Sequence, residues 1–405
     1  MTSLFAWRYF RSKKSANAIN IISWISVAAV AVVTAALIVV LSVFNGFEDL
    51  VQQLYSDFYS DIRITSASSK WMDANAGYLQ KVKGVSGVRS AEPVVEERAI
   101  LLQEEDKSIV WLKGVSNTYA SYSGVPNHIV RGTYQLGNAE HPSLVLGNGV
   151  ENALQIVAGQ TMGPVTIYLP NRGVAIDADP LTAMHSANAF AAGSFAIQQE
   201  FDNQYAFTDL AFMQYMLDLK PGQSSAVELS LAPGADADAV ASSLRKKLGQ
   251  GFEVKTRYQQ NQSLFAAMQV EKLIIFGVAF LILLIAAFNI ISSLSVTVLE
   301  KERDITVLQA MGAHTTSIAR IYLKLGCILA GVGGIIGFVL GVAICLGQQH
   351  FHWVKLGGQS FIIDYFPVAM RWQDFLYILL LLFIISVFAG WLPARRASRV
   401  MLSLR

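Results

Sequence analysis

Four long apolar runs alternate with polar segments along the chain. The runs occupy residues 19–44, 273–298, 325–346 and 375–392, and no charged residue lies between Lys14 and Glu48. A helix needs roughly 20 apolar residues to cross about 30 Å of hydrocarbon, so the pattern predicts four transmembrane helices. A signal peptide is the alternative for the first run, but its apolar stretch exceeds the usual length of about 7–15 residues, and no small-x-small cleavage site follows it.

The segment between the first two runs, residues 45–272, has a mixed α and β pattern. Alternating or β-branched stretches predict strands at 61–65, 94–102, 108–115, 165–169, 194–199, 226–231 and 252–257. Helical patterns occur at 75–82, 149–156, 207–217 and 237–248. The stretch 170–193 has no clear period, and we expect a long exposed loop there. The expected fold is an α-helical membrane protein with four transmembrane helices plus a large periplasmic α+β domain between the first and second spans.

Lysine and arginine near the span ends predict the orientation. They gather before the first span, between the second and third, and after the fourth, whereas the loop 347–374 contains only Lys355 and Arg371. Because positive residues are enriched on the cytoplasmic side, we expect segments 1–18, 299–324 and 393–405 to be cytoplasmic. Residues 45–272 and 347–374 then lie outside, and the protein is a multi-pass protein of the bacterial inner membrane.

The composition supports a membrane class. Hydrophobic residues make up 53% of the chain and charged residues 15%, against about 25% charged residues in soluble domains. The net charge of +2 gives no sign of nucleic-acid binding. Both cysteines, Cys327 and Cys345, lie in the third apolar run, so the external domain needs no disulfide for export.

No motif for catalysis is present in the sequence. It contains no GxxxxGK[ST] phosphate-binding loop and no HExxH, GxSxG or CxxC. We therefore expect no enzymatic activity, no cofactor and no metal on this chain. The four apolar runs contain no Asp, Glu, Lys, Arg or His, which argues against a proton pathway. The energy for transport must come from another source.

Two further patterns concern the helices themselves. Gly333, Gly337 and Gly341 recur at every fourth position of the third span, which favours close helix packing. From residue 261 a helical pattern runs directly into the second span, so the external domain and this span are expected to share one helix. That helix either couples their movements or only anchors the domain.

The segment 299–314 is the most informative stretch. Charged residues come first, apolar Ile305, Val307, Leu308 and Met311 follow at mixed spacing, and Gly312 comes last. This pattern is typical of a short amphipathic helix at the cytoplasmic membrane surface. A solvated connector is the alternative.

The same region resembles a known family. The sequence AAFNIISSLSVTVLEKERDITVLQAMGA is similar to the second span and following loop of the lipoprotein-releasing permeases, the LolC/LolE family. RYFRSKK, IISWISVAAVAVV, LSVFNGFE, LVLGNGVENALQIVAGQ and WLPARRASRV also resemble that family. The similarity covers nearly the whole chain. The wider superfamily includes MacB-type efflux permeases and FtsX-type division proteins.

The resemblance implies a dimer of four-span permeases, homodimeric or heterodimeric, with two copies of a separate ATPase that binds ATP and Mg. Such a complex extracts lipoproteins from the inner membrane and passes them to a periplasmic carrier. The ATPase-coupling residues would be Glu302, Arg303, Ile305, Leu308, Met311 and Gly312. A cleft for lipid and cargo, exposed to membrane lipids, would be lined at its outer mouth by Asn45, Gly46 and Phe47, and across from them by Leu264, Phe265 and Met268.

Two other functions remain as alternatives. A MacB-type permease exports peptides or drugs and usually carries its ATPase on the same chain, before the first span. An FtsX-like regulator transmits force to external hydrolases without transport, and its external domain is typically smaller than residues 45–272. The region 170–193 is the right kind of place for a carrier-recruiting hook, but no hook motif matches it residue by residue.

Overall fold

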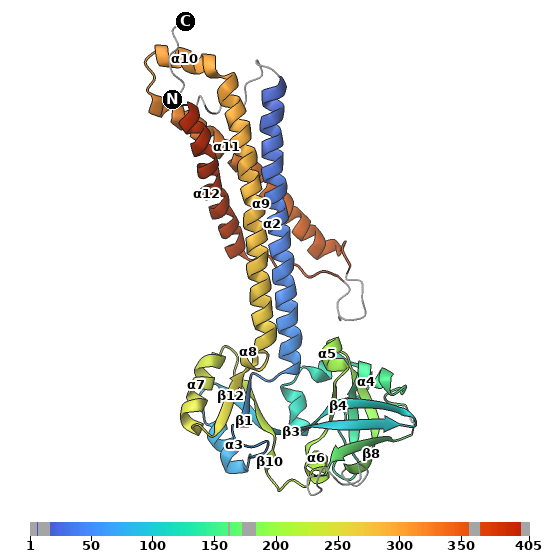
Figure 1. Ribbon diagram of the computed structural model, residues 1–405. Helices are drawn as coiled ribbons and strands as arrows, with labels where there is room; N and C mark the ends of the chain where they lie inside the picture. Colours follow the sequence, from blue (N-terminus) through green and yellow to red (C-terminus); the bar gives the residue numbers. More distant parts are fainter. Residues whose placement is uncertain (1–5, 7–16, 161–162, 172–183, 356–364, 398–405) are drawn as a thin grey trace. The chain divides into compact units, whose positions relative to one another are not determined.

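The computed structural model describes the chain except residues 1–5, 7–16, 161–162, 172–183, 356–364 and 398–405. The chain forms two compact units. The helical unit contains the described residues up to 50, together with 266–355 and 365–397, and the α/β unit contains residues 51–265. Two long helices, α2 (Asn17–Phe58) and α9 (Gln262–Glu300), contribute residues to both units (Figure 1).

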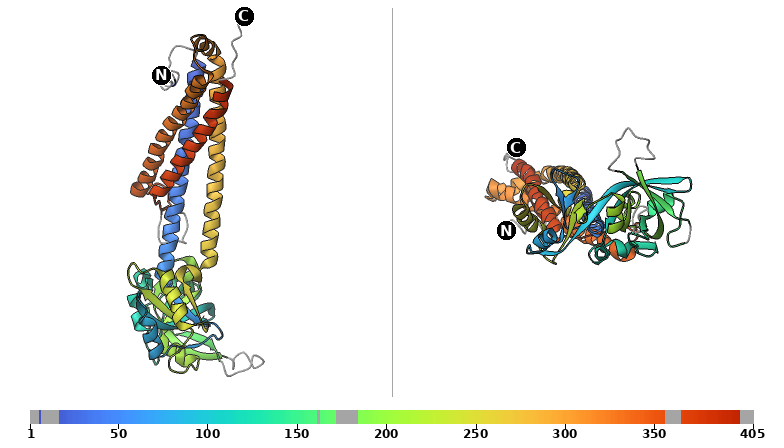
Figure 2. Two further views of the ribbon diagram at one scale, coloured as in Figure 1. Left: turned by 90° about the vertical axis from the view of Figure 1, so that its left-hand side faces the viewer. Right: turned by 90° about the horizontal axis from the view of Figure 1, so that it is seen from below.

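The helical unit contains the four helices that the apolar runs predict. Each run lies within one of the helices α2, α9, α11 (Thr315–Phe351) and α12 (Trp372–Ala397), and all four helices are long and apolar enough to cross a membrane. The short helix α10 (Glu302–Ala310) connects α9 and α11. Figure 2 shows α11 and α12 inclined to α2.

Glycines bring α11 close to α2 and α12. A Cβ atom at Gly333 would lie 2.7 Å from the carbonyl oxygen of Val27, and one at Gly341 would lie 2.9 Å from Cβ of Ile38. Gly337 faces the carbonyl oxygen of Ala31 even more closely. A Cβ atom at Gly326 would lie 3.1 Å from Cα of Gly390 in α12. These contacts need residues without side chains, because any larger residue would push the helix backbones apart.

The α/β unit is built on one large sheet with strand order β12-β1-β11-β3-β4-β9-β6-β8-β5. The long strand β3 also pairs with β7, and β7 pairs with β8, so β3, β4, β9, β6, β8 and β7 close into a barrel. The strands are β1 (Ile62–Ser66), β2 (Met72–Asp73), β3 (Val88–Gln103), β4 (Asp106–Val115), β5 (Ile129–Gly132), β6 (Ser143–Gly147), β7 (Val165–Pro170), β8 (Met184–Phe195), β9 (Tyr205–Asp209), β10 (Gln223–Ser224), β11 (Ala226–Leu231) and β12 (Phe252–Thr256).

Short helices cover this sheet and complete two apolar cores. They are α3 (Ala76–Lys83), α4 (Asn148–Ala153), α5 (Gln199–Asp202), α6 (Leu210–Met216), α7 (Ala237–Leu248) and α8 (Arg257–Gln260), with 3-10 turns η1 (Asn117–Ser121) and η2 (Val125–His128). One core fills the barrel around Leu101, Leu112 and Ile167. The other packs α3 and α7 on the open part of the sheet around Ile64 and Leu244. The Asp236 side chain caps α7 by accepting hydrogen bonds from the backbone N–H groups of Asp238 and Ala239.

Buried charges cross four neighbouring strands of the sheet, β1, β11, β3 and β4. Lys113 Nζ lies 2.8 Å from a carboxylate oxygen of Glu228, and both side chains are almost fully buried. Arg63 bridges Glu228 and Glu96, and Lys113 Nζ also donates to Tyr119 Oη at 3.1 Å. Burial opposes the charge on Lys113, but Glu228, Tyr119 and Glu96 together outweigh that effect and raise its pKa. Burial likewise opposes the charge on Glu96, but Arg63 and Lys113 hold its pKa below 4.5. The group is neutral in sum and its charges are paired, which offsets the cost of desolvation.

Three sequence predictions in this unit differ from the structure. The expected helix 207–217 is confirmed only over Leu210–Met216, as α6, because strand β9 extends to Asp209. The expected strand 194–199 ends at Phe195, where β8 ends, and helix α5 begins at Gln199. The expected loop 170–193 contains most of strand β8, which pairs with β7 from Met184 onward. Its residues 172–183 lie outside the described part of the chain. Alanine and glycine in β8 hide the alternation that indicates a strand.

Candidate functional site

The short helix α10 has one buried side and one exposed side. Ile305 is 1% exposed and packs in the core of the helical unit, whereas Val307 and Met311 are 58% and 79% exposed. Gly312 follows with a positive φ of 90°, a conformation that ends helices readily only at residues such as glycine. An amphipathic helix is therefore present where the sequence predicts one.

The residues that the sequence assigned to ATPase coupling do not all share the exposed side. Glu302, Arg303, Met311 and Gly312 are exposed and Leu308 is half-buried. For Ile305 the expected exposed position is corrected. Its side chain points into the helical unit and holds α10 in place, so it is not on the outer surface. Val307 is exposed and was missed, although the apolar pattern includes it.

Two apolar grooves lie between α9 and its neighbours α2 and α12. The first, the α2/α9 groove, has a volume of about 170 Å³ and is lined by Val33, Ala36, Leu37, Val40, Leu41, Ile274, Ile275, Val278, Ala279 and Ile282. The second, the central groove, has a volume of about 490 Å³ and is lined by Leu37, Leu41, Phe276, Ala279, Tyr377, Ile378, Leu380, Leu381 and Ile384. The two grooves share Leu37, Leu41 and Ala279. Together they offer an almost wholly hydrocarbon surface within membrane-length helices.

Around Lys272 of α9, ion pairs connect α2, α9 and the residue that precedes α12. Glu48 of α2 lies 3.3 Å from Lys272 of α9 and 3.2 Å from Arg371, which precedes α12. Arg371 also lies 2.6 Å from Asp49. We call these four residues the outer bridge. It ties α9 and the start of α12 to one carboxylate on α2.

Two of the residues expected at the cleft mouth are covered by the 365–374 segment. Asn45 is buried and its side chain donates to Asp374 at 2.5 Å. Gly46 lies directly against the backbone of Pro367. Phe47 is half-buried. In this arrangement Asn45 and Gly46 are closed off from a cargo.

The residues expected across from them belong to different units. Leu264 and Phe265 are in the α/β unit, where Phe265 stacks on Tyr258 with ring centroids 4.8 Å apart. Met268 belongs to the helical unit and is half-buried. That these residues form one mouth with 45–47 stays a prediction. Among the described residues, no group of three His, Cys, Asp or Glu side chains is placed to hold a metal.

Two family models match the chain. The model of the MacB-like periplasmic core domain matches residues 23–247, and that of the FtsX-like permease C-terminal region matches residues 276–401. The matches together cover most of the chain.

Relatives of similar length are also found. The chain is 26% identical to the lipoprotein-releasing system transmembrane protein LolE of Haemophilus influenzae, over 98% of this chain and 96% of the relative. It is 27% identical to LolC of Neisseria meningitidis, over 98% of each chain. Among solved structures, the periplasmic region of MacB from Actinobacillus actinomycetemcomitans aligns with a TM-score of 0.36 and 9% identity, over 53% of this chain and 97% of that structure.

These findings agree with the four apolar helices and the α/β unit. They identify a multi-pass inner-membrane permease of the ABC transporter class with a periplasmic domain. Membership of such a system implies association with an ABC ATPase and a second permease. The chain belongs to the LolC/LolE family of ABC transporter permeases, within the MacB/FtsX superfamily.

Proposed function

We propose that this permease extracts lipoproteins from the inner membrane, driven by a separate ATPase, and transfers them to a periplasmic carrier. The observation that carries the proposal is the pair of apolar grooves that flank α9. Lipid anchors hold a lipoprotein in the bilayer by about 0.8 kcal/mol for each buried CH₂. Extraction therefore needs an apolar surface to receive the chains and an external source of energy.

The proposed topology supplies both requirements. Segments 1–18, 299–324 and 393–405 are cytoplasmic, and residues 45–272 and 347–374 are periplasmic. The exposed face of α10, with Val307 and Met311, then meets the ATPase, which binds ATP and Mg. The four spans correspond to 19–44, 273–298, 325–346 and 375–392. The helix α9 continues from the α/β unit into the helical unit, so a push on α10 is transmitted toward the periplasm.

The experiment is a release assay in proteoliposomes that contain the permease pair, the ATPase and a fluorescent triacylated lipoprotein. ATP together with the periplasmic carrier should move the lipoprotein into the soluble fraction, and neither should do so alone. ATP hydrolysis that proceeds normally without any release would refute the proposal.

The match to the MacB-like model favours a second candidate, a MacB-type efflux permease. The same proteoliposomes separate the two functions. Stimulation of ATP hydrolysis by a soluble peptide or drug, with no stimulation by lipoprotein, would support efflux. An FtsX-like role would give ATP hydrolysis that responds to neither cargo.

A further inference from the structure

We propose that a third groove, between α9 and α12, binds a single acyl chain of a bilayer phospholipid. This α9/α12 groove shares only Ile384 with the central groove and no residue with the α2/α9 groove, and the proposal does not depend on lipoprotein release. It follows from the chemistry, the dimensions and the openness of the groove.

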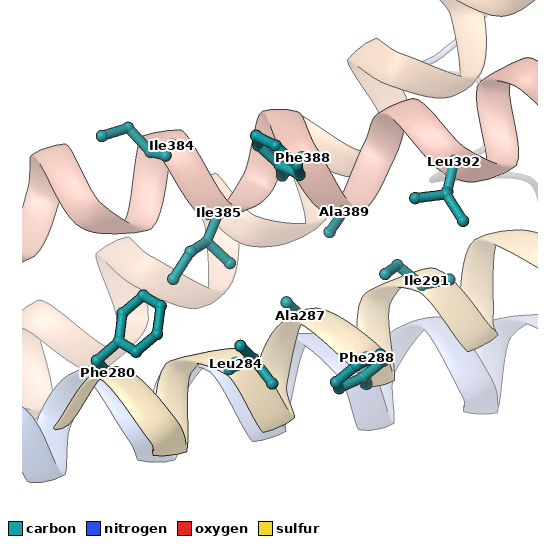
Figure 3. A pocket seen from close by; sticks show the side chains of 10 residues that line it. All are labelled: Phe280, Leu284, Ala287, Phe288, Ile291, Ile384, Ile385, Phe388, Ala389 and Leu392. Atoms are coloured by element: carbon teal, nitrogen blue, oxygen red, sulfur yellow. The ribbon is translucent and has the colours of Figure 1, made fainter. Parts of the chain in front are cut away.

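The lining of the α9/α12 groove is entirely apolar. Five side chains come from each helix: Phe280, Leu284, Ala287, Phe288 and Ile291 from α9, and Ile384, Ile385, Phe388, Ala389 and Leu392 from α12 (Figure 3). A headgroup, a peptide or an ion would find no hydrogen-bond partner among these side chains. The ligand must therefore be hydrocarbon.

The dimensions of the groove fit one acyl chain and are too small for an α-helix. The groove has a volume of about 370 Å³, and the stretch from Phe280 to Ile291 is about 16 Å long at 1.5 Å per residue. Its mean cross-section is thus about 22 Å², whereas an α-helix of about 10 Å diameter needs about 80 Å². A helix of a second permease does not fit into this space, but one extended methylene chain does.

Two alanines create the gap. Ala287 and Ala389 face each other across the groove, with Phe280 and Ile385 toward one end and Ile291 and Leu392 toward the other (Figure 3). An unfilled gap costs its lining atoms their dispersion contacts. A lipid tail is as apolar as leucine, so it fills the gap without a transfer cost.

The rim of the groove favours bilayer lipid over cargo. Phe288 and Phe388 are 62% and 68% exposed, so the groove opens sideways from the helical unit. Phospholipids reach such an opening by lateral diffusion and greatly outnumber any lipoprotein. Ala287 also lies near the middle of α9, between Lys272 and Glu300, where acyl chains and not headgroups are found.

The test uses the full permease in proteoliposomes of phosphatidylethanolamine that carries a photoreactive diazirine on one acyl chain. After irradiation, labelled peptides are mapped by mass spectrometry. We expect labels enriched on 280–291 and 384–392 relative to other lipid-facing positions such as Ile335 and Val339 of α11, which are also exposed.

The variant Ala287→Phe fills the groove from α9 and should reduce labelling there about fivefold, which corresponds to ~1 kcal/mol. Ala287→Leu should give a smaller reduction in labelling. This second variant keeps the test valid if Ala287→Phe fails to fold. Leu281→Phe is the matched control, since Leu281 is exposed on the same helix and does not line the groove, and it should leave labelling unchanged.

Three outcomes would overturn the proposal. Even labelling over all lipid-facing positions would mean that the groove holds no particular chain. Undiminished labelling in folded Ala287→Phe or Ala287→Leu would mean that the chain binds elsewhere. Labelling of the groove by a diazirine-bearing lipoprotein, but not by the phospholipid, would assign the groove to the cargo.

Discussion

Replacement of Glu48 by glutamine should free the outer end of α9 from α2. The carboxylate of Glu48 pairs with Lys272 of α9 at 3.3 Å and with Arg371 at 3.2 Å. Glutamine keeps the size of the side chain and removes the charge. Both ion pairs are then lost, and the α2/α9 groove opens more often.

The size of the expected effect follows from the solvent exposure of the Glu48–Lys272 ion pair. The side chains of Lys272 and Glu48 are 31% and 20% exposed, so solvent screens the pair and its contribution is about 0.5–1 kcal/mol. The loss of this amount raises the ratio of open to closed groove about two- to fivefold.

Thiol labelling at Ala279 measures this opening. Ala279 lines both the α2/α9 groove and the central groove and is 6% exposed, so a cysteine there should react only when α9 moves away. The experiment uses Ala279→Cys in a chain whose Cys327 and Cys345 are replaced by alanine. With a lipid-soluble maleimide, the labelling rate should rise about two- to fivefold in Glu48→Gln.

The control variants separate the two arms of the outer bridge. Lys272→Gln should reproduce the effect of Glu48→Gln. Asp49→Asn removes the same charge one residue away. Within the described part of the chain, Asp49 pairs with Arg371 and not with Lys272, so this variant should leave the rate unchanged. An equal rise in Asp49→Asn, or no rise in Lys272→Gln, would refute the idea that the Glu48–Lys272 pair holds the groove closed.

Four further predictions concern other parts of the molecule. Gly337→Leu should separate α11 from α2 and destabilise the permease by about 1–3 kcal/mol in thermal unfolding. Gly331→Leu is the control and should leave the stability unchanged, because a Cβ atom at Gly331 meets nothing within 4 Å. Equal melting temperatures for the two variants would contradict the close packing. Val307→Glu combined with Met311→Glu should abolish co-purification of the ATPase while the protein still inserts, because both side chains are exposed on α10; normal co-purification would exclude this face as the contact. Lys113→Met leaves the buried Glu228 without its closest cation and should cost about 3 kcal/mol of unfolding free energy. Because the pKa of Glu96 is lowered in the folded protein, its ionised form stabilises the fold. This contribution is complete above the ordinary pKa of 4.5 and is lost as the pH falls through the lowered pKa. A melting temperature that stays constant from pH 6 to pH 3 would contradict this prediction.

The sequence predicts the helical unit well, for a physical reason. A membrane-length apolar run has few alternatives to a helix, since every backbone polar group must be satisfied without water. Helix α10 is also predicted well, because its charges, its apolar spacing and Gly312 are all local signals in the sequence. Ile305 shows the limit of this reasoning, because the pattern indicates two faces but not which apolar residue is buried.

Contacts between distant residues could not be predicted in this way. Glu48 and Arg371 are 323 positions apart, and nothing local relates them. A charge of each sign at neighbouring span ends was the only available signal for the outer bridge. The barrel was missed for a similar reason, since β7 closes it by pairing with both β3 and β8.

We propose that acyl chains of a lipoprotein enter the space between α2 and α9 before ATP hydrolysis expels them. A photoreactive benzoylphenylalanine in place of Val278, which lines the α2/α9 groove, tests it directly in proteoliposomes with the ATPase and a triacylated lipoprotein. We expect a lipoprotein adduct in the absence of ATP that disappears once ATP and carrier are added. Benzoylphenylalanine in place of Ile285, which is exposed and lines none of the three grooves, should give no lipoprotein adduct. Adducts with phospholipid alone at Val278, or a lipoprotein adduct that ATP and carrier leave unchanged, would contradict it.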